Sequence, residues 1–215
     1  MVGRSTSKQI ERRKRIEDAA YAVLCESGYK STSLLSVARQ ASASNETLYN
    51  WYGNKQGLFR SLIEENAREA RKLLSDALTE AHDPLATVWA LGPILLALVT
   101  SNRAVALNRA AAADVAETHS LGPSISELGR ETIRPLLSEL LGRAAHEGLI
   151  ACTDPDHAVD IYFRLLIGDL QIRRVIGVLP ELTPTEIEER AEGAMILFVR
   201  LFAPTPTEFS RERSE

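Results

Sequence analysis

The sequence has few of the residues that bind metals or form disulfides. Only two cysteines occur among 215 residues, Cys25 and Cys152. The four histidines lack the spacing of metal ligands: His82, His119, His146 and His157. We therefore expect neither a metal site nor a cofactor, and the sequence leaves open whether either thiol has a redox role.

Signals of secretion and of catalysis are also missing. The N-terminus is polar and has no apolar segment typical of a secretory signal, so we expect a cytoplasmic protein with reduced thiols. No Ser/His/Asp, Cys/His, paired-carboxylate or glycine-rich phosphate-binding pattern is visible. We therefore expect a protein that is not an enzyme.

Strand patterns and internal repeats are absent from the sequence. Aromatic residues make up only 6% of the chain, whereas Ala, Leu and Glu are abundant, and this composition favours helices. No segment alternates apolar and polar residues as a half-buried strand would. The sequence thus predicts an all-α fold.

A single long apolar run extends from Pro84 to Ser101. Its length approaches that of a membrane span, but Gly92 and Pro93 interrupt it and amphipathic segments lie on both sides. We interpret it as a fully buried central helix that is kinked at Pro93, and we expect no membrane partner.

The charge is divided unevenly along the chain, whose formal net charge is −4. Residues 1–60 hold 10 Lys and Arg against 5 Asp and Glu, whereas residues 61–215 hold 15 against 24. A basic N-terminal module on an acidic body is typical of a nucleic-acid binder with a separate second domain.

Two short amphipathic segments within the basic part are joined by a turn of small residues. In the first, Leu34, Val37, Ala38 and Ala41 share one helical face. The turn is ASAS, residues 41–44, and its last residue is a good N-cap for a second helix over 45–52. This pattern predicts a helix–turn–helix, which places its second helix in the major groove of DNA.

The outer face of the second segment carries amides, a hydroxyl and flat aromatic rings. Asn45, Glu46 and Thr47 occupy the N-terminal positions that meet base edges, where Asn can pair with adenine and Glu can accept from cytosine. Tyr49 and Trp51 can donate to phosphate oxygens.

In this stretch the sequence resembles the DNA-binding domain of TetR-type transcriptional regulators. The resemblance covers residues 10–59 and is carried by TS(x)3VA from Thr32, TLY from Thr47, WY from Trp51 and NK(x)2LF from Asn54. It implies that matching positions meet DNA: Thr32, Ser33, Asn45, Thr47, Tyr49, Asn50, Trp51 and Lys55. Ser44 and Glu46, at the start of the second helix, complete the expected DNA-contacting set.

Two departures from the family pattern concern the turn and the recognition helix. Ser42 stands where the family usually has Gly, and a left-handed Ser costs on the order of 1 kcal/mol. Asn45 and Glu46 also differ from the residues common there, so the operator sequence cannot be inferred.

The remaining sequence predicts further helices. We expect a helix–turn–helix domain over 1–58, a helical regulatory and dimerisation domain over 59–204 and a disordered tail over 205–215. Helices are expected at 9–27, 33–40, 45–52, 57–82, 84–101, 102–118, 124–147, 156–178 and 185–202. Residues 1–8 are expected to form a loose arm, and the basic residues that follow are either phosphate contacts or a solvated helix start: Lys8, Arg12, Arg13, Lys14 and Arg15.

One helix–turn–helix covers one half-site, so a homodimer is expected. The last two long helices are the candidates for its interface, through Leu165, Gly168, Ile172, Ala191, Ala194, Met195 and Phe198. The same apolar residues could instead face the core of the monomer.

The family resemblance also implies a pocket for a small apolar effector among residues 60–150. Its candidate polar lining consists of Trp89, Asn108, Arg109 and His119. The overall interpretation is a homodimeric repressor that a small molecule releases from double-stranded operator DNA. The alternative is a ligand-independent architectural DNA-binding protein.

Overall fold

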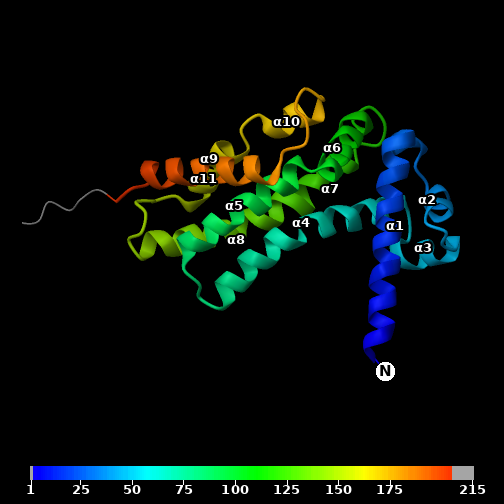
Figure 1. Ribbon diagram of the computed structural model, residues 1–215, viewed down its shortest axis with the longest axis horizontal. Coiled ribbons are helices and arrows are strands. Elements are labelled where there is room, and N and C mark those ends of the chain that lie inside the picture. The colour runs from blue at the N-terminus through cyan, green and yellow to red at the C-terminus, as the bar shows by residue number, and fades with distance from the viewer. Residues whose placement is uncertain (1, 205–215) are drawn as a thin grey trace, which may run out of the picture. The chain divides into compact units, whose positions relative to one another are not determined.

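The computed structural model describes the backbone of residues 2–204 and the side chains of residues 8–204 (Figure 1). All regular elements in this range are helical, as the sequence predicts. They are α1 (Val2–Ser31), α2 (Leu34–Gln40), α3 (Asn45–Tyr52), α4 (Lys55–Thr79), α5 (Pro84–Thr100), α6 (Asn102–Asp114), α7 (Leu121–Ile125), the π-helix η1 (Ser126–Arg130), α8 (Glu131–His146), α9 (Pro155–Ile167), α10 (Leu170–Val175) and α11 (Pro184–Leu201). The predicted disordered tail, 205–215, lies outside the described residues.

The chain divides into two compact units that each combine distant segments. The first contains residues 1–69, 97–132 and 169–182, and the second contains residues 70–96, 133–168 and 183–215. These units cross the expected domain boundary at residue 58, because α6 and α7 share a core with the N-terminal helices and α10 packs on α6.

The first unit has one apolar core that the predicted three-helix module shares with α6, α7 and η1. Leu48 of α3 and Phe59 of α4 are buried in it together with Leu107 of α6. Leu121 of α7 and Leu128 of η1 complete the cluster. The helix–turn–helix therefore depends on residues more than fifty positions away for part of its packing.

The N-terminal helix is longer than predicted. It begins at Val2, so the expectation of a loose arm over 1–8 is wrong for the described residues 2–8. The predicted break at Gly28 is confirmed, because that residue has φ 74° and ψ 169° within the stretch assigned to α1. Tyr29 follows it into the core and meets the Phe59 ring edge-on, with centroids 4.9 Å apart.

The turn between α6 and α7 is organised around Asp114, which is buried. Its carboxylate accepts from the Thr118 hydroxyl at 2.7 Å and from the backbone N–H groups of Ser120 and Leu121 at 2.9 and 3.1 Å. Burial alone would raise the pKa of Asp114, but these donors outweigh it and hold the pKa below its ordinary value.

The predicted continuous helix over 156–178 is wrong. It breaks at Gly168, whose φ of 50° and ψ of −126° are not helical, and α10 follows as a separate short helix. The buried Arg174 anchors α10: it donates to the carbonyls of Thr100 at 2.9 Å and Leu179 at 3.1 Å, and to Asn102 Oδ1 at 2.6 Å. Several strong acceptors thus replace the water that this charge has lost.

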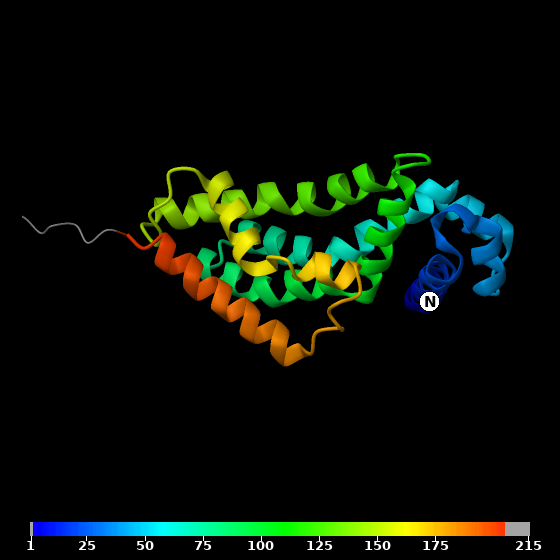
Figure 2. The ribbon, with the colours of Figure 1, turned by 90° about the horizontal axis from the view of Figure 1, so that it is seen from above.

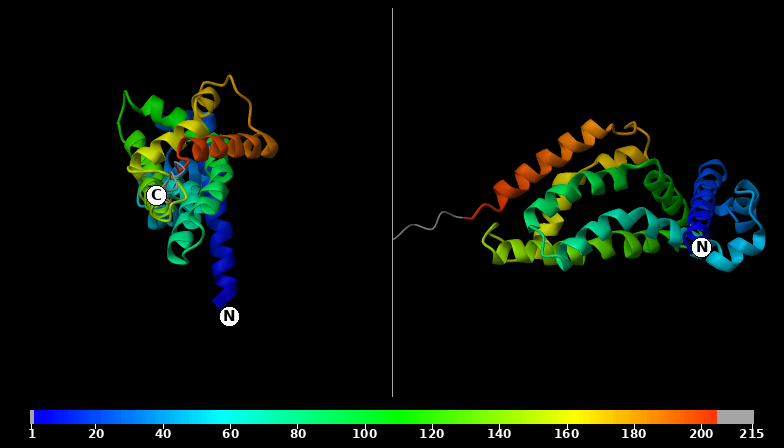
Figure 3. Two further views of the ribbon diagram at one scale, coloured as in Figure 1. Left: turned by 90° about the vertical axis from the view of Figure 1, so that its left-hand side faces the viewer. Right: turned by 60° about the horizontal axis from the view of Figure 1, so that its bottom comes forward.

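In the second unit, α9 lies between α8 and α11 (Figure 2), and α11 runs alongside α9 (Figure 3). The Tyr162 hydroxyl donates to the Val88 carbonyl of α5 at 3.1 Å, and its ring packs edge-on against Phe198. A Cβ on Gly92 would lie 3.1 Å from both Ala191 Cβ and Tyr162 Oη, so α5 approaches α9 and α11 closely at that glycine.

Two predictions about the middle of the chain need correction. The segment at 84–101 is a helix but not fully buried, since Trp89 is 46% exposed and Ala86, Ala90 and Ala97 are also exposed. The helix expected from 124 begins at Leu121, because Gly122 and Pro123 fit into a first helical turn, where a proline N–H is not needed.

Among the described residues, no single helix is long and apolar enough to cross a membrane. Only α5 and α6 taken together have the length and apolar composition of a membrane span, and these two helices are bent by 51° at the break between them.

We predict that Asp114→Ala destabilises the fold by about 2–3 kcal/mol, because buried N–H donors lose their acceptor. Denaturant unfolding at neutral pH measures this, and Glu117→Ala, which removes an exposed carboxylate from the same turn, should change stability little.

The native pKa of Asp114 lies below its unfolded value. Its contribution is therefore complete above the unfolded pKa, near 4, and is lost as the pH falls further. An Asp114→Ala deficit that did not shrink between neutral pH and the acid region would contradict this role.

Candidate nucleic-acid interface

The two helices of the motif are joined by a turn with the expected chemistry. Ser33 caps α2, because its hydroxyl oxygen accepts from the Ser36 N–H at 3.0 Å. The Ser36 hydroxyl oxygen in turn accepts from the Ser33 N–H. Ser42 has φ 49°, which confirms that this position is left-handed. The Ala43 N–H then bonds to the Ala38 carbonyl at 2.9 Å and closes the end of α2.

Helix α3 has two contrasting faces. Leu48 is fully buried, and Trp51 and Tyr52 are half-buried against the core of the first unit. The opposite face is exposed and consists of Asn45, Glu46, Tyr49 and Asn50. Because burial of Leu48 fixes which way the helix faces, these polar side chains point away from the core and are free to meet base edges and phosphates.

The first turn of α3 is held by hydroxyl groups. Ser44 accepts from the Thr47 N–H at 3.2 Å, and the two hydroxyl oxygens lie 2.7 Å apart. Thr47 also accepts from Arg12 Nη2 of α1 at 2.7 Å. The predicted N-cap is therefore present, and the Thr47 side chain is part of the scaffold of the helix.

Two of the expected DNA contacts need correction. Thr32 is buried and its hydroxyl donates to the Gly28 carbonyl at 2.8 Å. The Lys55 ammonium donates to the carbonyls of Tyr29 and Lys30 and lies 3.9 Å from the Tyr29 ring centroid. The last carbonyls of a helix lack partners within the helix and attract a cation, so Lys55 is turned inward. Burial lowers its pKa.

Other cations on this module remain available to phosphates. Lys14 and Arg15 on α1 and Arg39 in the last turn of α2 are exposed, and within the described part of the chain they have no charged partner. Arg39 was not predicted as a DNA contact, although its position just before the turn of a helix–turn–helix indicates that it could bind a phosphate.

The link from α3 to α4 depends on two further residues, to which the sequence assigned no structural role. Asn54 Oδ1 accepts from the Gly57 N–H at 2.8 Å and so caps α4. A Cβ on Gly57 would lie only 2.0 Å from the Tyr52 carbonyl oxygen, so only glycine fits there. This link fixes where α3 ends relative to α4.

A buried polar cluster joins α1 to α4. Arg13 donates to Glu17 Oε1 at 3.2 Å and to the Ser61 hydroxyl at 2.8 Å. Burial raises the pKa of Glu17, and the charge of Glu65 adds to this effect. Burial also raises the pKa of Tyr52 to about 12. The cluster holds the base of the DNA-binding module, with Glu17 and Ser61 buried and the Arg13 side chain partly exposed.

The four residues expected to line an effector pocket are divided between the two compact units. Trp89 belongs to the second unit and the other three to the first. Within the first unit, the Asn108 amide donates to the Ala104 carbonyl, and Arg109 donates to the Val175 carbonyl at the end of α10. His119 is exposed in the turn after α6. Trp89 lines a groove of the second unit, and the full predicted lining stays a prediction.

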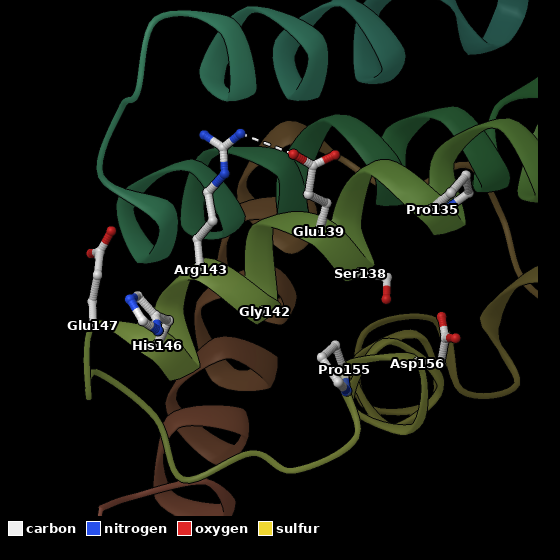
Figure 4. Close-up of a pocket in the computed structure, with 9 residues that line it drawn as sticks. All are labelled: Pro135, Ser138, Glu139, Gly142, Arg143, His146, Glu147, Pro155 and Asp156. Atoms are coloured by element: carbon white, nitrogen blue, oxygen red, sulfur yellow. Dashed lines mark hydrogen bonds and ion pairs between the residues drawn. The ribbon is translucent and has the colours of Figure 1, made fainter.

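Two open grooves occur in the second unit. One, of about 640 Å³, is lined by Trp89 and Leu85 of α5, Met195 and Val199 of α11, and neighbouring residues. The other, of about 700 Å³, runs along α8 to the start of α9 (Figure 4). Glu139 and Arg143, one turn apart on α8, form an ion pair at 2.9 Å at its edge. This second groove has more charged residues in its lining than the first.

A capped helix–turn–helix with an exposed amide-bearing second helix, set in an all-α chain, defines a DNA-binding transcription regulator. Residues 16–62 match the family model for the N-terminal domain of bacterial regulatory proteins of the tetR family. Residues 87–204 match that of the C-terminal domain of AefR-like transcriptional repressors. The chain belongs to the TetR family of transcriptional regulators.

Individual relatives agree with this assignment. The chain is 34% identical over 61 residues to the uncharacterised HTH-type transcriptional regulator YvkB of Bacillus subtilis, a match that spans 28% of this chain and 32% of that relative. A TetR-family regulator from Mesorhizobium loti has a similar fold, with a TM-score of 0.71 at 21% identity over 90% of this chain and 97% of that one. FadR from Bacillus subtilis, solved in complex with stearoyl-CoA, has a TM-score of 0.66 at 17% identity, and the match covers 86% of this chain and 97% of that one.

We predict that Asn45→Ala relaxes base preference at one position in each half-site, at a cost of about 1–3 kcal/mol against the preferred base. Selection of bound duplexes from a random pool measures this. Gln56→Ala, which removes an exposed amide just beyond α3, serves as the control. An unchanged selected motif would show that Asn45 does not meet a base.

We also predict opposite salt responses for two cations. Arg39→Ala should reduce the slope of log affinity against log salt by about one unit per monomer, because a phosphate contact is lost. Lys55→Ala should leave that slope unchanged and lower thermal stability instead. The reverse pattern would place Lys55 rather than Arg39 on the phosphates.

Proposed function

We propose that this protein is a homodimeric repressor that binds a two-fold symmetric operator and is released from it by a small apolar effector. The exposed face of α3 carries the proposal, because its amides and hydroxyl are donors and acceptors suited to base edges and phosphates. The matching AefR-like repressor domain supports the sign of the regulation.

The dimer surface proposed from the sequence changes with the structure. Ala191, Ala194, Met195 and Phe198 are buried within the second unit, where Phe198 packs against Tyr162. They form the monomer core, which is the other interpretation their apolar pattern allowed.

The outward face of α11 is a better candidate for the partner surface. Leu197 and Leu201 lie one turn apart and are 48% and 65% exposed, and Ile196 beside them is 37% exposed. Leu165 is half-buried and Gly168 is exposed near the end of α9, while Ile172 of α10 is 55% exposed. Burial of Leu197, Leu201 and Ile196 against a second copy would remove them from water.

The groove between α5 and α11 is the part of the second unit best suited to an apolar effector. Its volume of about 640 Å³ lies within the usual range of small-molecule sites, and most of its lining is apolar. Trp89, which was expected from the sequence to line an effector pocket, lines this groove. FadR, which has the same fold, holds stearoyl-CoA, and this makes an acyl-CoA the first compound to test.

Two helices can carry a signal to the DNA-binding helices. Helix α4 begins directly after α3 and contributes residues to both compact units. Helix α6 packs on α1, where Arg103 pairs with Asp18, and Glu117 beyond it pairs with Lys30 at 2.8 Å. An effector that prefers one arrangement of these helices would change operator affinity.

The dimer surface is tested by Leu197→Glu combined with Leu201→Glu. We predict folded monomers whose operator affinity falls steeply, because each half-site alone is weak. Light scattering and circular dichroism measure assembly and folding. Glu192→Ala, at an exposed polar position of α11, should remain dimeric, whereas Ala194→Glu should unfold the protein. Intact dimers with normal operator binding in the double variant would move the interface elsewhere.

Effector release is tested by calorimetric titration with stearoyl-CoA, and then with shorter acyl-CoAs, in the presence and absence of operator duplex. Linkage requires that operator weakens effector binding by the same factor as effector weakens operator binding, typically about 5- to 150-fold. Trp89→Ala should weaken effector binding and leave operator affinity unchanged. Equal effector affinity in both titrations would favour the ligand-independent architectural alternative.

A further inference from the structure

Arg12 of α1 contacts the recognition helix α3 at two places. Its Nη2 donates to Thr47 Oγ1 at 2.7 Å, and its guanidinium carbon lies 5.4 Å from the centroid of the Trp51 ring. Thr47 and Trp51 are four positions apart and therefore occupy one side of α3 on successive turns. One planar cation thus spans the first and second turns of the helix.

The hydroxyl that Arg12 binds belongs to the N-terminal cap of α3. Thr47 Oγ1 lies 2.7 Å from Ser44 Oγ, and Ser44 accepts from the Thr47 N–H at 3.2 Å. Asn45 and Glu46 stand between these two residues, at the positions expected to face base edges. Any change in the Arg12–Thr47 contact therefore acts on the turn that carries them.

We propose that Arg12 is a positioning residue that sets the orientation of α3 and so contributes to base preference, without itself contacting DNA. The inference rests on the proposed function. A guanidinium can donate a directed hydrogen bond and stack on an aromatic ring at the same time, which a lysine ammonium on a flexible stem does less well. Arg12 thereby fastens α3 to α1 through Thr47 and Trp51.

The neighbouring basic residues differ from Arg12 in this respect. Arg13 is bound to Glu17 and Ser61 and so ties α1 to α4. Arg15 is exposed, with no charged partner within the described part of the chain. It is therefore a matched control, since it has the same side chain on the same helix and no contact with α3.

The experiment is a double-substitution cycle with Arg12→Ala and Thr47→Val. Fluorescence anisotropy measures binding to a duplex carrying the motif that the wild-type protein selects from a random pool, and to single-base variants of it. The ratio of the two affinities reports discrimination, and a salt series reports phosphate contacts. Circular dichroism confirms that each variant is folded.

We expect Arg12→Ala to reduce discrimination roughly tenfold, the size of one charge-assisted hydrogen bond, with an unchanged salt slope. In the Thr47→Val background, Arg12→Ala should lose most of its effect. Arg12→Lys should restore little, Thr47→Ser should retain discrimination because it keeps the hydroxyl, and Arg15→Ala should leave discrimination unchanged.

Three results would overturn the proposal. A uniform loss of affinity for all duplexes, with a salt slope smaller by about one unit per monomer, would make Arg12 a phosphate contact. Fully additive effects of the two substitutions would show that Arg12 does not act through Thr47. Unchanged discrimination in both single variants would show that the Arg12–Thr47 contact has no role in base preference. If the wild-type protein selects no motif at all, the proposed function fails before Arg12 is tested.

Discussion

Burial of Leu48 in the core of the first unit is the constraint on which the DNA-binding surface depends. Helix α3 has only eight residues, too short to be stable alone, so its position comes from packing. Leu48 is fully buried in a cluster that includes Phe59 of α4, Leu107 of α6 and Leu121 of α7. The exposed polar face of α3 is the consequence of that anchoring. Because the same cluster joins α3 to α4 and α6, a movement of either helix can reach the DNA-binding surface.

Features set by local chemistry were predictable from the sequence. The bounds of α3, its Ser44 cap, the left-handed Ser42 and the break at Gly28 all follow from side chains within a few positions of the backbone they affect. The inward direction of Leu48 follows from helical periodicity. These features were sufficient to predict an all-α fold and the class of DNA-binding motif.

Features set by distant partners were not predictable. Lys55 was expected on phosphates, but the carbonyls of Tyr29 and Lys30, about 25 positions away in the sequence, bind it instead. An apolar stripe also does not distinguish the monomer core from a partner surface, and Phe198 proved to be buried within the chain. The contact of Arg12 with Thr47 depends likewise on tertiary packing.

In the proposed function, α3 is a recognition helix that a dimer presents twice to one duplex. The most direct measurement is selection of bound duplexes by the wild-type protein from a random pool, followed by sequencing. We expect an inverted repeat whose half-site centres lie about 10–10.5 base pairs, or a multiple of this, apart. Binding without enrichment of any motif would contradict it, since an exposed face of amides and hydroxyls would then not be recognising bases.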